Sequence, residues 1–226
     1  MGKRPLLYYI TDRNAFPGNE LERRLRLLHK ITEAAKAGVD YVQLREKDLS
    51  TGELESLARE ALNNLNQLRT QNPELKTALL INSRTDVVLT AGADGVHLRS
   101  DDISPRDVKQ ILQRGAFGPA CDPLIGVSCH SPEEVKKAAA NLASFAAFGP
   151  IFEKKDAPKV TSAGLAQLQE ACHHNIPVFA LGGITSSNAQ ACLETGATGI
   201  AAIRLFQENE VAAVVQNLSS ESKHPT

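Results

Sequence analysis

The feature that most constrains the fold is a short segment that occurs three times along the chain. Each copy has a glycine suited to ending a helix, then a short turn and an apolar run typical of a buried strand. The three copies are Ala37–Leu44, Ala91–Leu98 and Thr195–Ala202. Their glycines, Gly38, Gly92 and Gly196, stand 54 and 104 residues apart, which corresponds to two and four units of 26 or 27 residues. Eight such units need about 216 residues, so repeated βα units are predicted to fill nearly the whole chain of 226 residues.

Eight apolar runs of strand length alternate with helical patterns, in agreement with this repeat. The predicted strands are Leu6–Thr11, Asp40–Leu44, Ala78–Asn82, Gly95–Leu98, Leu124–Ser128, Phe145–Gly149, Pro177–Leu181 and Gly199–Ile203. Between two of them, Ser131-Pro132 with Glu134 predicts a helix that begins with a capping box. Buried strands that alternate with helices imply a parallel sheet. No glycine-rich dinucleotide motif is present, so a closed barrel is favoured over a doubly wound sheet.

The predicted fold is therefore α/β, a single (β/α)8 TIM barrel with eight parallel strands. We expect the barrel domain to cover residues 1–217 and to be followed by a polar, disordered C-terminal tail, residues 218–226.

The amino-acid composition limits the classes of partner that the protein is expected to bind. With 25 basic and 26 acidic residues the formal net charge is −1, which argues against binding nucleic acid or an anionic membrane through bulk charge. No apolar run reaches the length of a membrane span. The four cysteines, Cys121, Cys129, Cys172 and Cys192, form no C-x-x-C pair, which favours free thiols in a reducing cytoplasm. We expect a cytoplasmic protein whose partners are small phosphorylated molecules, with a homodimer left open.

The active site of such a barrel lies on the loops that follow the strands. Charged and polar residues gather in those loops, whereas the loops that precede the strands are short and rich in glycine and alanine. Gly182-Gly183 follows the seventh predicted strand, with Thr185 expected to cap a helix, and Ile203-Arg204 follows the eighth. Backbone N–H groups at such loops are suited to binding phosphate.

Several of these loop segments, taken in order, resemble the motifs of thiamine phosphate synthases. The matching segments are Tyr41–Asp48, Ile81-Asn82, Gly92–Leu98, Gly126–His130, Phe148–Phe152 and Ala180–Thr185. The similarity covers roughly residues 6–207. The same superfamily includes thiazole tautomerases, which share the barrel and act in the same pathway.

The resemblance implies a transferase reaction of thiamine biosynthesis. Diphosphate leaves a hydroxymethylpyrimidine, and the nitrogen of a thiazole phosphate captures the resulting cation. Mg²⁺ is the implied cofactor, with Asp102 as its protein ligand. The implied diphosphate and pyrimidine ligands are Gln43, Arg45, Lys47, Asn82, Ser128 and Lys154, and the implied thiazole phosphate ligands are Gly182, Gly183, Ile203 and Arg204. Lys47, Ser128 and His130 are the candidate catalytic residues.

The chain departs from the synthase pattern at three places. Ser83 stands where the family usually has a metal-binding aspartate, and Arg204 stands where it has a serine. The segment Phe152–Asp156 lacks the Pro-Thr-x-Thr stretch that contacts diphosphate in the family. These losses fit a thiazole tautomerase, which needs no metal and would use His130 for proton transfer. A third possibility is a non-catalytic regulator that binds a thiazole phosphate. Gln43, Lys47 and Asp102 keep the synthase pattern, so the synthase is the leading hypothesis.

Two neighbouring groups have simpler explanations. His97 lies within a predicted strand and is expected to be a hydrogen-bonded core histidine. Glu46 and Asp48 are expected to pair at the surface with the adjacent basic residues.

Overall fold

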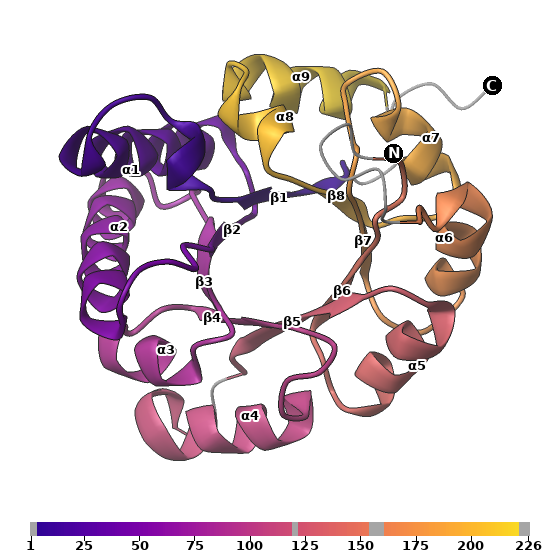
Figure 1. Cartoon of the computed structure of the whole chain (residues 1–226), viewed down its shortest axis with the longest axis horizontal. Coiled ribbons are helices and arrows are strands. Elements are labelled where there is room, and N and C mark those ends of the chain that lie inside the picture. Colours follow the sequence, from indigo (N-terminus) through magenta and orange to yellow (C-terminus); the bar gives the residue numbers. More distant parts are fainter. Residues whose placement is uncertain (1–3, 119–121, 154–160, 222–226) are drawn as a thin grey trace.

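Eight parallel strands close into a barrel that is surrounded by helices (Figure 1). This computed structural model describes residues 4–118, 122–153 and 161–221. The first strand closes the ring, because Tyr8 lies opposite Tyr41 of the second strand and Ala201 of the eighth. The predicted TIM barrel is confirmed.

The elements follow one another in strict alternation. The strands are β1 (Leu6–Ile10), β2 (Tyr41–Leu44), β3 (Ala78–Asn82), β4 (Gly95–Leu98), β5 (Leu124–Cys129), β6 (Phe145–Phe148), β7 (Val178–Leu181) and β8 (Gly199–Ala202). The main helices are α1 (Glu20–Ala37), α2 (Thr51–Gln71), α3 (Thr85–Ala91), α4 (Pro105–Leu112), α5 (Pro132–Ala140), α6 (Gly164–Cys172), α7 (Ala189–Glu194), α8 (Arg204–Gln207) and α9 (Val211–Glu221). Two short helical segments, η1 (Arg13–Ala15) and η2 (Gln113–Phe117), complete the set. Every predicted strand agrees with the structure to within one residue at each end.

Two apolar cores hold the barrel together. The larger core lies between the strands and the helices, and the smaller core fills the barrel. Aromatic rings dominate the smaller core: the Tyr8 ring centroid lies 5.3 Å from that of Phe145 and 5.7 Å from that of Phe179. Because buried apolar side chains fill both cores, the loops at the strand ends stand on a rigid base.

Side-chain caps set where several helices begin. Asn19 and Glu22 form a reciprocal capping box at the start of α1. Ser131 accepts a hydrogen bond from the Glu134 amide at the start of α5, as predicted. The Glu134 carboxylate, however, accepts from the His130 amide at 2.7 Å. The predicted capping box of α5 is therefore only half formed, and its glutamate instead ties down the loop after β5.

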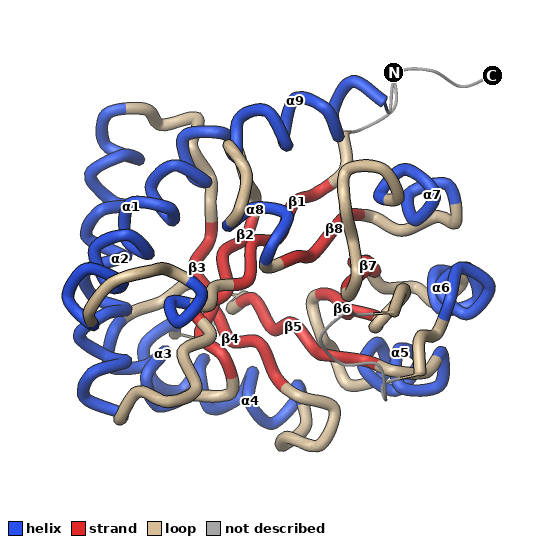
Figure 2. Tube along the Cα trace, turned by 45° about the horizontal axis from the view of Figure 1, so that its top comes forward, coloured by secondary structure: helices blue, strands red, loops and turns tan. Residues whose placement is uncertain are grey.

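The last helix continues past residue 217, where the barrel domain is expected to end. Helix α9 continues to Glu221, and its Leu218 side chain is buried in the larger core. The Val211 backbone amide donates a hydrogen bond to the Glu33 carboxylate at 3.0 Å, which joins α9 to α1. The ordered domain thus extends past residue 217, and α9 lies on the outside of the barrel (Figure 2). Within the described ranges, no helix has the length and apolarity needed to cross a membrane.

Candidate active site

The loop after β2 is shaped by Glu46, which lies underneath it. The Glu46 carboxylate accepts hydrogen bonds from the Thr11 hydroxyl at 2.5 Å, the Arg13 amide at 3.0 Å and the Arg13 guanidinium at 3.3 Å. Its side chain is only 1% exposed. The Arg45 backbone amide donates to the same Thr11 hydroxyl at 3.0 Å. Thr11 therefore binds both the backbone of Arg45 and the side chain of Glu46. The expectation of a surface pair for Glu46 is wrong.

Arg13 holds Glu46 and the loop in place, and the sequence did not identify it as a structural residue. Its guanidinium is almost completely buried and bonds to Asp48 at 2.6 and 2.8 Å and to Glu20 at 2.7 Å, in addition to Glu46. The pKa of the Asp48 carboxyl is held well below its usual range by this hydrogen bond to Arg13. Asp48 does form an ion pair, as expected, but with a partner 35 residues away in the sequence. No local pattern reveals such a pair.

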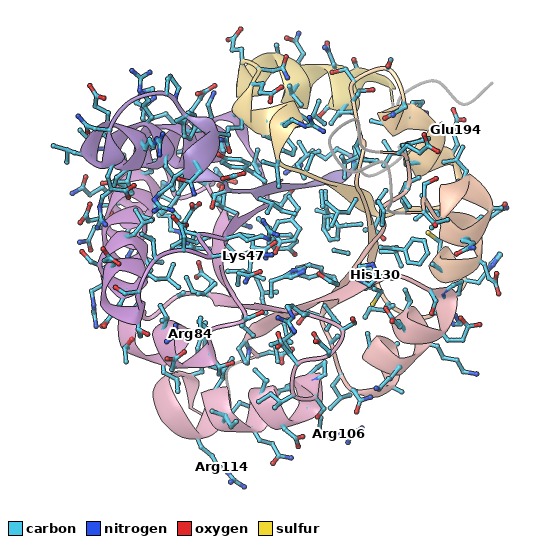
Figure 3. All side chains as sticks on the ribbon, viewed as in Figure 1. Lys47, Arg84, Arg106, Arg114, His130 and Glu194 are labelled. Carbon is cyan, nitrogen blue, oxygen red and sulfur yellow. The ribbon has the colours of Figure 1, made fainter. Side chains whose placement is uncertain are left out.

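Basic side chains of the loops after β2 and β4 lie near one another next to this buried Glu46–Arg13 pair. The positive charge of Arg45, together with partial burial and Arg99, lowers the pKa of the Lys47 ammonium. Such mutual influence means that three basic side chains from two loops share one region. Figure 3 shows Lys47 inside the ring of helices, with Arg106 and Arg114 on its periphery. A region of this kind is suited to binding a multiply charged anion.

Two predicted amide ligands meet on neighbouring strands. The Gln43 amide nitrogen donates to the Asn82 oxygen at 2.8 Å, at the ends of β2 and β3. This bond orients both amides, since it identifies the Asn82 oxygen as the acceptor. In the part of the chain that the structure describes, the Asn82 side-chain nitrogen has no hydrogen-bonding partner. This donor is therefore available to a ligand.

The predicted metal ligand Asp102 lies next to Ser83. One carboxylate oxygen of Asp102 accepts hydrogen bonds from the Ser83 hydroxyl and from the Arg99 amide, both at 2.8 Å. Ser83 has a left-handed backbone with φ 53°. The described residues contain no group of three His, Cys, Asp or Glu side chains placed to hold a metal. The donor set is therefore one carboxylate with a neighbouring hydroxyl, which suits Mg²⁺ where substrate oxygens and water supply the remaining ligands.

Ser128 and the two histidines of this face have different surroundings. Ser128, at the end of β5, has its hydroxyl 2.9 Å from His97 Nε2, and Tyr8 lies on the other side of that imidazole. Burial, with a smaller effect of Arg45, lowers the pKa of His97 to about 3. The expectation of a core histidine is confirmed.

His130 is exposed and follows β5 directly. Its Nδ1 lies 2.6 Å from the Gly149 carbonyl oxygen, which can only accept, so Nδ1 carries a proton. Figure 3 places His130 inside the ring of helices, as it does Lys47. Nε2 is therefore the ring nitrogen that this hydrogen bond leaves available.

The double glycine after β7 forms a loop that other residues cannot occupy. Gly182 and Gly183 have φ values of 95° and 69°. A Cβ on Gly183 would lie 2.7 Å from the Phe152 Cβ and 2.8 Å from its carbonyl oxygen. Among the described residues, neither the Gly183 nor the Ile184 amide has a hydrogen-bonding partner. Two backbone donors are thus left at the predicted phosphate loop.

Two details of this region differ from the sequence expectations. Helix α7 begins at Ala189, so Thr185 caps no helix. Instead, its amide donates to the Asn188 side chain at 2.8 Å, and Asn188 donates back to the Gly183 carbonyl at 3.0 Å. On the adjacent loop, Ile203 precedes the single-turn helix α8, and Arg204 is exposed at its first position. Lys154 lies outside the described residues.

A cavity of about 240 Å³ adjoins the metal and serine positions. It extends from Asp102 and Ser128 outward between α4 and α5, and its lining includes Arg99, Cys129 and Lys137. Predicted site residues on β4, β5 and their loops therefore border one hollow. The other predicted residues that the structure describes lie at the ends of β2 and β3 or on the loops after β2, β5, β7 and β8, at the same end of the strands.

Comparison with known proteins agrees with this geometry. The family model for thiamine monophosphate synthase matches residues 7–206. A putative thiamine-phosphate synthase 2 of Aquifex aeolicus is 40% identical over 90% of this chain and 98% of its own length. A thiamine-phosphate synthase of Syntrophomonas wolfei is 35% identical, over 87% and 86% of the two chains. The solved thiamine phosphate pyrophosphorylase of Pyrococcus furiosus is similar with a TM-score of 0.74 and 29% identity, over 96% of this chain and 95% of that one. The chain therefore belongs to the thiamine monophosphate synthase family, transferases of thiamine biosynthesis.

Proposed function

We propose that the protein joins hydroxymethylpyrimidine diphosphate to a thiazole phosphate, giving thiamine phosphate and diphosphate. The observation that carries this proposal is the basic loop of Arg45 and Lys47, held in place by the buried Glu46, together with Asp102 on the loop after β4. The site thus offers positive charge to an anion and a hard oxygen ligand to a divalent cation.

In the reaction, the carbon–oxygen bond to diphosphate breaks and the electron pair leaves with that oxygen. The thiazole nitrogen then forms the new carbon–nitrogen bond with its own lone pair. No proton has to move in this exchange, so the residues act by charge and position. Arg45 and Lys47 stabilise the negative charge that grows on the departing diphosphate, and an opposite charge at that place favours the protonated form of Lys47.

Mg²⁺ would be held by Asp102 and by oxygens of the substrate and water, where it neutralises part of the diphosphate charge. Ser83 supports Asp102 through its 2.8 Å hydrogen bond. Gln43 and Asn82 orient each other at the ends of β2 and β3 and present polar groups to the pyrimidine. At the opposite side, the Gly183 and Ile184 amides and the Arg204 side chain bind the thiazole phosphate.

The test is an assay of the purified protein with both substrates and Mg²⁺, followed for thiamine phosphate. Lys47→Ala is expected to lower turnover by roughly ten- to a hundredfold, because it removes one charge-assisted contact to the leaving group. Lys36→Ala, an exposed lysine at the end of α1, is the matched control and should match the wild type. If Lys47→Ala turns over as fast as the wild type, Lys47 does not contact the diphosphate leaving group.

One observation favours a second candidate, a thiazole tautomerase. The Gly149 carbonyl fixes the proton of His130 on Nδ1, which leaves Nε2 as a base in an exposed position. A tautomerase of this design loses about 10²–10⁴-fold in activity with His130→Ala and is indifferent to Mg²⁺. The synthase keeps most of its activity in the same variant. Mg²⁺-independent tautomerisation that disappears with His130, without thiamine phosphate from the wild type, would replace the first candidate by the second.

A further inference from the structure

A line of three polar side chains runs from the barrel core to the active site. The Tyr8 hydroxyl lies 2.9 Å from His97 Nδ1, and His97 Nε2 lies 2.9 Å from the Ser128 hydroxyl oxygen. Tyr8 is fully buried, His97 is 2% exposed, and Ser128 is at the rim. The line ends at the cavity that Asp102 also borders.

The direction of the hydrogen bonds along this line is set at its buried end. Over the described ranges, His97 Nδ1 is the sole partner of the Tyr8 hydroxyl. Burial raises the pKa of this phenol well above its usual value, so the phenol keeps its proton. A buried hydroxyl that received a bond from Nδ1–H would have no acceptor for its own proton. Tyr8 therefore donates, and Nδ1 accepts.

The imidazole transmits this direction to Ser128. Burial keeps the pKa of His97 far below neutrality, so the ring carries a single proton. With Nδ1 as the acceptor, that proton is on Nε2 and is donated to the Ser128 oxygen. The hydroxyl proton of Ser128 is then not used by His97.

Packing holds the ring in this position. His97 lies opposite Gly126 of β5, and a Cβ on Gly126 would lie 2.8 Å from His97 Nδ1 and 2.4 Å from the Phe145 ring. The Phe145 centroid is 6.1 Å from that of the imidazole. Glycine at this place makes room for both rings, so the imidazole has little freedom to turn over and exchange its two nitrogens.

We propose that Tyr8 and His97 are positioning residues that hold Ser128 as a hydrogen-bond donor toward the leaving diphosphate. A Ser128 hydroxyl that donated to His97 would turn its lone pairs toward the anion and repel it. One that accepts from Nε2–H keeps its proton for the anion and is polarised as a donor. The last step rests on the proposed function, whereas the order of the protons does not.

The proton order has a readout that is independent of activity. Spectra that correlate imidazole nitrogens with ring protons, recorded on protein with ¹⁵N-labelled histidine at neutral pH, distinguish the two neutral tautomers. We expect His97, assigned by its loss in His97→Gln, to be neutral and protonated on Nε2. A proton on Nδ1, or an imidazolium, overturns the proposal.

The effect on the anion is measured with Tyr8→Phe, which keeps the ring and removes the donor. Wild type and variant are titrated with inorganic diphosphate in the presence of Mg²⁺, and kcat and KM are measured with both substrates. We expect affinity and kcat to fall roughly two- to tenfold, the size of one neutral hydrogen bond. Tyr41→Phe is the matched control, because its ring packs on Tyr8 at 5.9 Å, whereas His97 forms its hydrogen bonds with Tyr8 and Ser128.

A double-mutant cycle separates this role from a structural one. If Tyr8 acts through Ser128, Tyr8→Phe has no further effect on kcat or on diphosphate affinity in a Ser128→Ala background. Equal losses in both backgrounds overturn the proposal. If the wild type forms no thiamine phosphate, the proposed function fails, while the tautomer and the diphosphate titration still decide the positioning role.

Discussion

At the scale of single residues, Ser83 is the immediate neighbour of the predicted metal ligand Asp102. Its hydroxyl donates to the Asp102 carboxylate at 2.8 Å, at the position expected for a second metal-binding carboxylate. The left-handed backbone of Ser83 suits aspartate and asparagine better than most other residues. Either replacement is therefore compatible with the loop.

Ser83→Asp is expected to make Mg²⁺ binding tighter. Two carboxylates at hydrogen-bonding distance repel each other, and a divalent cation between them removes that repulsion. The variant should melt lower than the wild type without Mg²⁺ and gain melting temperature as Mg²⁺ is added, since binding to the folded state stabilises it. Ser83→Asn is the neutral control and should show no added Mg²⁺ dependence. If the melting temperature of Ser83→Asp responds to Mg²⁺ no more than that of Ser83→Asn, Asp102 is not a metal ligand.

At the residue level, positions at the strand ends could be predicted from the sequence, whereas tertiary contacts could not; the ligand roles of these residues stay predictions. Gln43, Asn82 and Asp102 lie where their positions after the strands imply. Glu46 looked like its charged neighbours in the sequence, yet it is the buried member of the loop. Its partners Thr11 and Arg13 are more than 30 residues away, so nothing local marks it out.

At the scale of elements, the loops after β1 and β2 act as one unit. Glu46 links them through three hydrogen bonds, and Thr11 also receives the Arg45 amide. The charge of Glu46 is matched by Arg13, which keeps two further carboxylate partners. The position of Arg45 and Lys47 thus depends on a buried ion pair that touches no substrate.

Glu46→Gln is expected to destabilise the protein by about 1–3 kcal/mol, because it weakens three buried hydrogen bonds at once. Urea unfolding measures this loss. Glu55→Gln, which removes a partly exposed i,i+4 pair with Arg59, is the control and should cost about 0.5 kcal/mol or less. The KM for the pyrimidine substrate should rise in Glu46→Gln as its loop loosens. Equal stabilities of the two variants would contradict the role given to Glu46.

The glycine loop after β7 leaves little room for a side chain at Gly183, so a substitution there should affect stability as well as binding. Gly183→Ala meets both a positive φ and the Phe152 backbone. Gly92→Ala is a matched control, since Gly92 has φ 76° and open space around its Cβ. It should cost about 1–2 kcal/mol, the price of a left-handed backbone. Gly183→Ala should cost more in urea unfolding and also abolish thiazole phosphate binding in calorimetry; equal losses would mean that Phe152 yields.

The strands were predictable because each is a short, buried apolar run between turn residues, and the repeat fixed their number. The helix start at Ser131 followed from the serine–proline pattern, and α4 begins with the same pattern at Ser104. The end of α9 did not follow from a sequence pattern, because its last turns are mostly polar and the burial of Leu218 is a tertiary contact. The start of α7 was shifted because Asn188 binds the loop that Thr185 was expected to close.

At the scale of the whole molecule, the barrel encloses the hydrogen-bonded pair Tyr8 and His97 within an aromatic interior. The His97 imidazole contacts Tyr8 on one side and Ser128 on the other, and the rings of Phe145 and Tyr8 pack around it. Arg45 adds positive charge that further disfavours an imidazolium, and Asp102 acts weakly in the opposite direction. A buried neutral histidine of this kind ties the stability of the entire barrel to pH.

The pKa of His97 is about 3 in the folded chain, well below the usual value near 6.5. Between these values the unfolded chain takes up a proton that the folded chain does not, so acidification favours unfolding. The contribution of His97 is therefore complete above about pH 6.5 and falls as the pH drops toward about 3, by about 1 kcal/mol per pH unit. Urea unfolding from about pH 7 to about pH 4.5 should give a shallower pH dependence for His97→Gln than for the wild type. His29→Gln, a change at an exposed histidine of α1, leaves the buried imidazole in place and serves as the control. Parallel curves for the wild type and His97→Gln would show that the barrel interior accepts a charged imidazole.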